Sequence, residues 1–249
     1  MKEIVFSPTG GTKKVGDIIT SLFSNNYDVI DLCDRNLSFK DISLSSDELS
    51  VILIPVYGGR APAISMERLS QINGNGSKAV VVAVYGNRDY KDTLIETYDI
   101  AKKAGFKVIA GIAAIAEHSM AREIAANRPD ECDREELSNI VSIIKEKLDH
   151  EDVKLPGTFP YVVFNKIPQA PIVSDACVGC GLCATKCVTG AINPSNVKEC
   201  DAEKCIMCFR CIDNCPVKAR SVDENFLGRI KEKLKEACAD RKHNELFVD

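Results

Sequence analysis

Nine of the twelve cysteines lie within 39 residues in the last third of the sequence, and eight of these nine are regularly spaced. They form two runs of one pattern, Cys177-x2-Cys180-x2-Cys183-x3-Cys187 and Cys205-x2-Cys208-x2-Cys211-x3-Cys215. Thiolates are soft ligands that favour zinc and iron-sulfur clusters. A zinc site would explain only four of these cysteines, whereas two 4Fe-4S clusters use all eight. The repeated run therefore predicts two iron-sulfur clusters, with zinc as the alternative.

The spacing also predicts how the cysteines are shared between the clusters. Three thiolates that are separated by two intervening residues can surround one cluster, while the fourth points toward the other cluster. We therefore expect one 4Fe-4S cluster on Cys177, Cys180, Cys183 and Cys215, and the other on Cys205, Cys208, Cys211 and Cys187. The four remaining cysteines are expected to be buried apolar thiols; they are Cys33, Cys132, Cys200 and Cys238.

A second group of reactive residue types follows the first expected strand. The segment Ser7-Pro8-Thr9-Gly10-Gly11-Thr12-Lys13 combines three hydroxyl side chains with two glycines, directly before an expected helix. Hydroxyl groups and the free N-H groups of a helix start can bind a phosphate. The alternative is a helix N-cap with a glycine-rich turn. The segment lacks the Gly-x4-Gly-Lys-Ser/Thr pattern, so it does not indicate ATP hydrolysis.

Two further loops contain glycines and tyrosines that suit a planar ring. They are Pro55-Val56-Tyr57-Gly58-Gly59-Arg60 and Tyr85-Gly86-Asn87-Arg88-Asp89-Tyr90. Glycines allow backbone N-H groups to approach a ring, and tyrosines can stack on it. We expect Tyr57 and Tyr90 to stack, whereas packing within the sheet competes for Tyr85.

The elements that carry these loops alternate short apolar runs with amphipathic stretches. Strands are expected at 3–6, 29–32, 51–55, 79–85 and 108–115, and helices begin near Lys13, Pro62 and Lys91, with a last one at 135–147. This alternation predicts an α/β domain over residues 1–150, with a doubly wound parallel sheet of five strands. Ligands bind such sheets at the carboxyl ends of the strands, where these loops lie.

The rest of the chain divides into three parts. The periodicity stops over residues 151–173, where Pro156, Pro160, Pro168 and Pro171 predict a proline-rich connector. Its apolar patch, residues 159–164, should pack on one of the domains. The cysteine runs define a small domain at 174–224, and apolar residues at helical spacing predict a helical tail at 225–249.

The Ser-x-Thr-Gly-x-Thr loop after the first of five strands resembles the FMN-phosphate loop of flavodoxins, and residues 172–224 resemble bacterial ferredoxins with two 4Fe-4S clusters. Together with the Tyr-Gly-Asn-Arg and Glu-His-Ser segments, these parts resemble the EFR-type ferredoxin family of anaerobic bacteria and archaea. The resemblance implies a flavodoxin-like sheet of order 2-1-3-4-5, a small α+β ferredoxin domain and bound FMN. The FMN contacts that it implies are Ser7, Thr9, Gly10, Gly11, Thr12, Tyr57, Gly58, Gly59, Arg60, Tyr85, Gly86, Asn87, Arg88 and Tyr90.

Three charged or titratable side chains could act on a bound flavin. Arg60 and Arg88 either stabilise a reduced, anionic flavin or face solvent. His118, in the segment Glu117-His118-Ser119 after the fifth expected strand, is a weak candidate for a proton donor to reduced flavin or substrate. A capping or surface role for His118 is the alternative.

The two cofactors together indicate electron transfer. FMN can hold one or two electrons and a cluster moves one, so their combination predicts an oxidoreductase-type carrier that passes electrons between clusters and FMN in anaerobic redox metabolism. The alternatives are an FMN-dependent reductase of a small substrate and a redox-sensing or assembly protein without FMN.

Composition and charge exclude other classes. Hydrophobic residues make up 45% and charged residues 27% of the 249 positions, which excludes global disorder. The net charge of -4, without a basic stripe, argues against nucleic-acid binding. No apolar run reaches the roughly 20 residues of a membrane helix, and the first residues do not form a signal peptide. We therefore expect a cytoplasmic protein with redox proteins as partners, and the sequence leaves a homodimer open.

Overall fold

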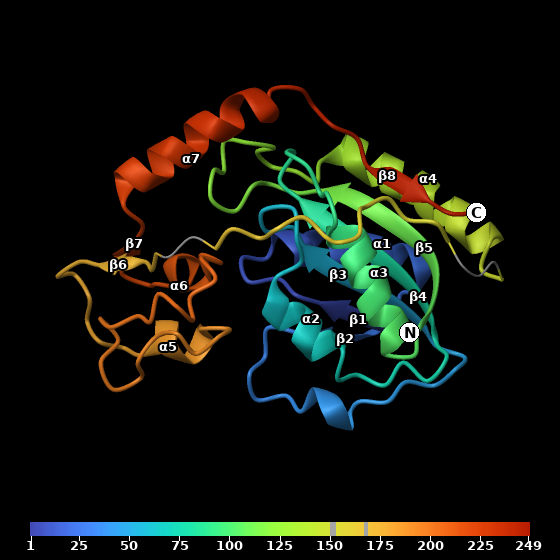
Figure 1. The fold of residues 1–249 in the computed structure, drawn as a ribbon, viewed down its shortest axis with the longest axis horizontal. Helices are drawn as coiled ribbons and strands as arrows, with labels where there is room; N and C mark the ends of the chain where they lie inside the picture. The colour runs from blue at the N-terminus through green and yellow to red at the C-terminus, as the bar shows by residue number, and fades with distance from the viewer. Residues whose placement is uncertain (150–152, 167–168) are drawn as a thin grey trace.

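The computed structural model describes residues 1–149, 153–166 and 169–249, which form a large α/β domain beside a small cysteine-rich domain (Figure 1). The large domain contains one sheet of order β2-β1-β3-β4-β5-β8. Its strands are β1 (Lys2–Val5), β2 (Asp28–Asp31), β3 (Leu49–Pro55), β4 (Lys78–Tyr85), β5 (Lys107–Ile115) and β8 (Glu245–Phe247). The first five strands are parallel, which confirms the predicted order 2-1-3-4-5.

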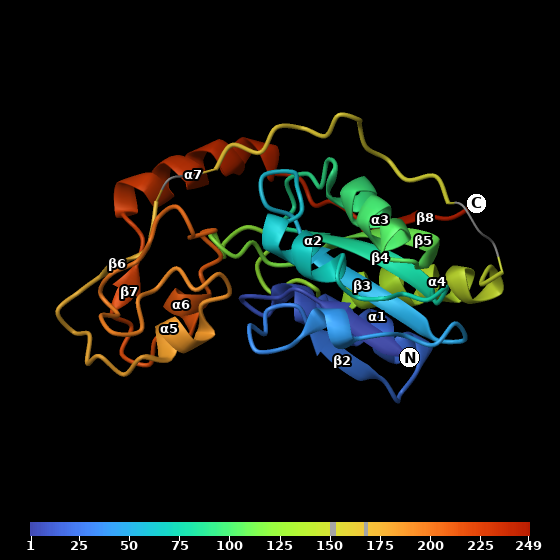
Figure 2. The same cartoon turned by 60° about the horizontal axis from the view of Figure 1, so that its bottom comes forward.

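Helices cover both faces of the sheet (Figure 2). Helices α1 (Gly11–Phe23) and α4 (Glu131–Glu146) lie on one face, and α2 (Ala63–Leu69) and α3 (Thr93–Lys103) lie on the other. Along β4, Val80 and Val82 therefore face α1 and α4, whereas Val81 and Ala83 face α2 and α3. Because both faces are covered, the central strands are continuous apolar runs.

The end of the chain adds a strand that the sequence did not predict. Helix α7 (Glu224–Ala237) forms as expected, but the chain then returns to the large domain, where β8 pairs antiparallel with β5. A strand of three residues is too short to produce a periodic pattern. The tail is therefore helical only in its first half, and its second half belongs to the sheet of the large domain.

A polar network holds this returning tail. The Asn87 side-chain amide donates to the carbonyls of Cys238 (3.0 Å) and Asp240 (2.9 Å) and accepts from the Lys242 N-H (3.1 Å). Nearby, the guanidinium of Arg128 pairs with Asp133, and both side chains are almost fully buried. Buried polar groups that are fully bonded fix one arrangement of the chain.

The small domain contains α5 (Leu182–Lys186) and α6 (Arg210–Asp213), together with the antiparallel strands β6 (Ile172–Val173) and β7 (Arg220–Ser221). A short 3-10 helix, η1 (Phe39–Asp41), lies in the large domain. The buried guanidinium of Arg68 joins the two domains, since it donates to the carbonyls of Leu32 (2.6 Å) and Val188 (2.9 Å). Arg35 likewise donates to the Cys187 carbonyl (3.2 Å). These bonds fix the cysteine runs beside the large domain.

The connector is anchored by a carboxylate at the start of α3. Asp92 accepts hydrogen bonds from the N-H groups of Thr158 (2.9 Å) and Val162 (2.6 Å). Burial opposes the charge of Asp92, but these hydrogen bonds prevail and lower its pKa below the usual value. The apolar patch packs only in part: Phe159 and Val163 are 87% and 80% exposed, because an extended segment contacts the domain through one side. Pro168 lies outside the described residues. No helix within the described ranges is long and apolar enough to cross a membrane.

Candidate cofactor site

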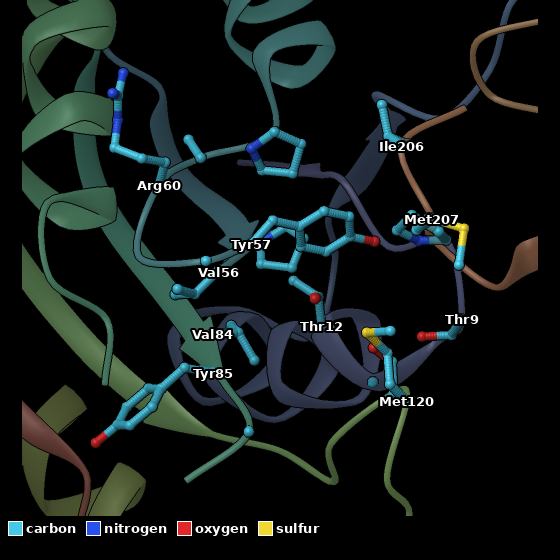
Figure 3. Close-up of a pocket in the computed structure, with 18 of the residues that line it drawn as sticks. Thr9, Thr12, Val56, Tyr57, Arg60, Val84, Tyr85, Met120, Ile206 and Met207 are labelled. Carbon is cyan, nitrogen blue, oxygen red and sulfur yellow. The ribbon is translucent and has the colours of Figure 1, made fainter. Parts of the chain in front are cut away.

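A cavity of about 530 Å³ lies at the carboxyl ends of β1, β3, β4 and β5 (Figure 3). The large domain contributes the loops that follow these four strands. The connector contributes residues 164–166, and the small domain contributes Glu203 and residues 205–207. One cavity therefore joins the predicted phosphate loop, the predicted ring loops and a predicted cluster ligand, Cys205.

The phosphate loop has its bonding groups at the start of α1. Gly10 adopts a left-handed conformation (φ 87°), and the Ser7 hydroxyl accepts from the Lys13 N-H (2.9 Å). Thr9, Gly11 and Thr12 line the cavity. The first N-H groups of a helix have no partner inside the helix, and within the described residues none is recorded for those of Gly11 and Thr12. These donors and the two threonine hydroxyls fit a phosphate group, without an acidic residue in the first turn to repel it.

The loop after β3 places Tyr57 at the centre of the cavity (Figure 3). Two hydrogen bonds between the backbones of Tyr57 and Arg60 close a turn, in which Gly58 and Gly59 have φ angles of 61° and 89°. Burial raises the pKa of Tyr57 well above its usual value, and Cys208, Cys33 and Cys205 add to the effect. Tyr57 is therefore a neutral phenol that lies between the strand ends and the cysteines.

Arg60 lies at the rim of the cavity, where it is fully engaged. Its guanidinium forms two 2.7 Å bonds with the Glu96 carboxylate and donates to the Val162 carbonyl (2.8 Å). It also lies over the ring of Tyr161, 4.8 Å from the centroid. We expected Arg60 either to stabilise a reduced, anionic flavin or to face solvent. Its contacts fit neither role, because they attach the connector to the large domain. Gly58 lines the cavity, and Gly59 does not.

The loop after β4 divides between the cavity and the tail. Tyr85 and Gly86 line the cavity, although the side chain of Tyr85 points away from it and packs edge-to-face on Tyr90 (5.4 Å). Tyr90 is outside the lining, and its hydroxyl bonds to Glu245 (3.1 Å). Arg88 is exposed, also outside the lining. Asn87 holds the tail, as described above. The sequence could not indicate this role, because the partners of Asn87 are more than 150 residues away in the chain.

His118 packs directly over Gly86 at the cavity wall. A Cβ atom at Gly86 would lie 2.5 Å from the Cδ2 atom of His118, so only glycine fits beneath the ring. The Nδ1 atom accepts from the N-H groups of Met120 and Ala121, both at 3.2 Å. Burial lowers the pKa of His118, which agrees with a neutral imidazole that carries its proton on Nε2. The ring can thus donate a hydrogen bond from Nε2 to a group in the cavity.

The cysteines of the second predicted cluster lie together. Cys187, Cys205, Cys208 and Cys211 line one narrow cavity between the two runs. The pKa of Cys211 is raised to about 12, mainly by burial. The nearby Arg220 opposes this shift, whereas Cys208, Cys205 and Cys187 add to it. Cys187 thus lies near the three cysteines of the other run, as the predicted sharing requires. The N-H groups of Ala191 and Ala219 donate to the sulfurs of Cys187 and Cys215, both at 3.2 Å.

The other predicted set is nearer the surface. Cys177 and Cys183 pack with Ala184 in the core of the small domain, whereas Cys180 is exposed. Within the described ranges, no three His, Cys, Asp or Glu side chains are placed to hold a single metal ion. Of the remaining cysteines, Cys33 and Cys238 are buried and Cys200 is half-buried, but Cys132 is exposed on α4, so the expectation of a buried thiol was wrong there.

Several lining residues were not predicted from the sequence. Met120 and Met207 pack together beside Cys205, and Ile206 and Phe164 complete the cover. One signal for Met207 existed in the repeat, because the equivalent position in the first run is Gly179. Phe164 could not be found, since its contact with Gly58 depends on the path of the connector.

Comparisons with known proteins give partial matches. No family model matches the chain. A stretch of 68 residues, 27% of the chain, is 34% identical to an uncharacterized polyferredoxin-like protein of Methanocaldococcus jannaschii and covers 30% of that protein. The chain thus matches less than a third of the length of this relative.

Among solved structures, a flavodoxin of Streptococcus pneumoniae is 19% identical, with a TM-score of 0.39, over 59% of this chain and 97% of that one. A Fusobacterium nucleatum flavodoxin bound to flavin mononucleotide is 17% identical, with a TM-score of 0.40, over 58% of this chain and 96% of that one. An archaeal flavodoxin is 17% identical, with a TM-score of 0.41, over 60% of this chain and all of that one. The strand order 2-1-3-4-5 of the large domain is itself the flavodoxin-like order.

Proposed function

We propose that this protein is a flavo-iron-sulfur electron carrier, with FMN in the 530 Å³ cavity and two 4Fe-4S clusters on the eight cysteines. The observation that carries the proposal is the shared lining: the cavity at the strand ends includes Cys205, which belongs to a cysteine set of the small domain. Electron transfer needs cofactors that are close to each other, and this cavity provides that closeness.

Each part of the cavity has a task in this proposal. Thr9, Thr12 and the N-H groups at the start of α1 bind the phosphate of FMN. Tyr57 contacts the flavin ring, and Gly86 leaves room for His118 at its edge. Ile206 and Met207 cover the ring and exclude water. When bound, FMN exchanges one or two electrons and each cluster exchanges one. We do not assign ring contacts to Arg88 or Tyr90, because neither lines the cavity.

The Thr12 hydroxyl tests the phosphate site. Thr12→Val keeps the shape of the side chain but removes a donor to the phosphate, so the Kd of FMN for the apoprotein should rise about 10-fold or more, as expected for a lost bond to a charged group. Ser21→Ala is the control, since it removes a hydroxyl from the same helix outside the cavity lining. Fluorescence titration measures both; equal affinities for the two variants would contradict the phosphate site.

Turnover separates a carrier from a reductase. Protein that has been reduced once gives up a fixed number of electrons if it is a carrier, whereas a reductase consumes substrate catalytically in the presence of a reduced ferredoxin. Failure of the apoprotein to bind added FMN would instead favour a sensing or assembly role without flavin.

A further inference from the structure

The two cysteine runs share left-handed backbone at three equivalent positions, which are 28 residues apart in the sequence. Gly179, Gly181 and Gly190 have positive φ angles of 71°, 78° and 68°, and the equivalent Met207, Phe209 and Lys218 have φ angles of 51°, 64° and 52°. The N-H bonds of Ala191 and Ala219 to cysteine sulfur also repeat. In the loop between the first two cysteines of each run, the equivalent residues Gly179 and Met207 therefore share a left-handed conformation.

The second copy of this loop is used inside the molecule. Ile206 packs against the core of the large domain, and Met207, only 7% exposed, packs beside Met120 at the cavity. A left-handed conformation is unfavourable for a residue with a side chain, so Met207 needs this packing to offset the strain. The loop thus presents its cysteines to a surface made by strand-end loops.

The first copy of the loop has no such surface within the described chain. Val178, equivalent to Ile206, is 68% exposed, and Cys180 is exposed as well. A Cβ atom at Gly179 would meet no atom within 4 Å. Val217, two residues after Cys215, is 40% exposed. Both valines are therefore exposed neighbours of cysteines assigned to the same cluster.

We propose that this surface, formed by residues 178–180 and 216–218, is the docking site for an acidic one-electron carrier protein, and the proposal rests on the cluster assignment of the proposed function. The shape of the loop supports it, because the equivalent loop already docks on a domain. Charge selects the partner: Lys218, which is exposed, is the one charged residue of these two segments, and Asp175, three residues before Val178, is paired with Lys198 (3.9 Å). Complementary charge of this kind steers association.

Binding of a small acidic ferredoxin to the holoprotein tests the site. Val178→Glu places a negative charge and a polar group at the centre of the surface, so the Kd measured by titration calorimetry at low salt should rise at least 10-fold. Val163→Glu is the matched control, because Val163 is a similarly exposed valine on the connector; its Kd should change less than twofold. Added salt should weaken binding to the wild type.

Three results would overturn the docking site: an unchanged Kd for Val178→Glu, an equal loss for Val163→Glu, or tighter binding of cytochrome c, a basic carrier. Iron, sulfide and FMN are measured on each sample. Loss of FMN with intact ferredoxin binding would contradict the proposed function, whereas full cofactor content with no effect of Val178→Glu would contradict the docking site alone.

Discussion

Replacing Cys205 with Ser is expected to remove about four of about eight iron atoms per chain and to slow reduction of the bound flavin by reduced ferredoxin at least 100-fold. Cys205 is the one predicted ligand that also lines the large cavity, and it lies in the narrow cavity with Cys187, Cys208 and Cys211. Loss of a ligand removes the cluster beside the flavin. Iron and sulfide analysis and anaerobic stopped-flow absorbance measure the two effects.

Cys132→Ser is the matched control for this experiment. Cys132 is exposed on α4 and belongs to neither predicted set, so its replacement should leave iron content and flavin reduction unchanged. Full iron content in Cys205→Ser would show that Cys205 is not a ligand. Equal rates of flavin reduction in Cys205→Ser and wild type would show that the cluster beside the cavity does not supply the flavin.

Replacing Asp133 with Ala is expected to lower the free energy of unfolding by about 3–5 kcal/mol, the cost of leaving a buried charge without its partner. The side chain of Asp133 is fully buried and pairs with Arg128, whose side chain is 4% exposed. Asp133 also closes a capping box with Asp130 at the start of α4 and accepts from Asn244 (3.0 Å), next to β8. The substitution therefore weakens the helix start and the returning tail together. Urea denaturation followed by circular dichroism measures the loss.

Glu123→Ala provides the comparison for Asp133→Ala. Glu123 pairs with Lys231 at 2.8 Å, but both side chains are largely exposed, and such surface pairs contribute about 0–1 kcal/mol. Similar losses for the two variants would mean that the Arg128–Asp133 pair is not buried as described.

The sequence was sufficient for the parts of the fold that follow local patterns. The five parallel strands and the helices between them appear where apolar periodicity placed them, because both faces of the sheet require apolar residues. β8 was not predicted, because three residues are too few to show a hydrophobic period. Its pairing with β5 also requires the end of the chain to return to the large domain. The connector shows the same limit: Tyr161 and Phe164 contact the large domain, whereas Phe159 and Val163 are largely exposed.

The candidate site was predicted in outline, from loops that end strands, but its details depend on long-range contacts. Asn87 has the residue type and position of a ring contact, yet its amide is occupied by the tail. Arg60 similarly has its charge matched by Glu96. Met207 differs from Gly179 at the equivalent position of the repeat, but nothing local to the cysteine runs indicates which copy of the loop faces the cavity.

The most direct test of the account is the cofactor content of protein purified without oxygen. Iron, acid-labile sulfide and released flavin are measured per chain, together with an absorption spectrum before and after addition of FMN. We expect about eight iron atoms, about eight sulfides and one FMN per chain. Protein with the same iron and sulfide that binds no FMN after its addition would contradict the claim that the cavity beside Cys205 is a flavin site.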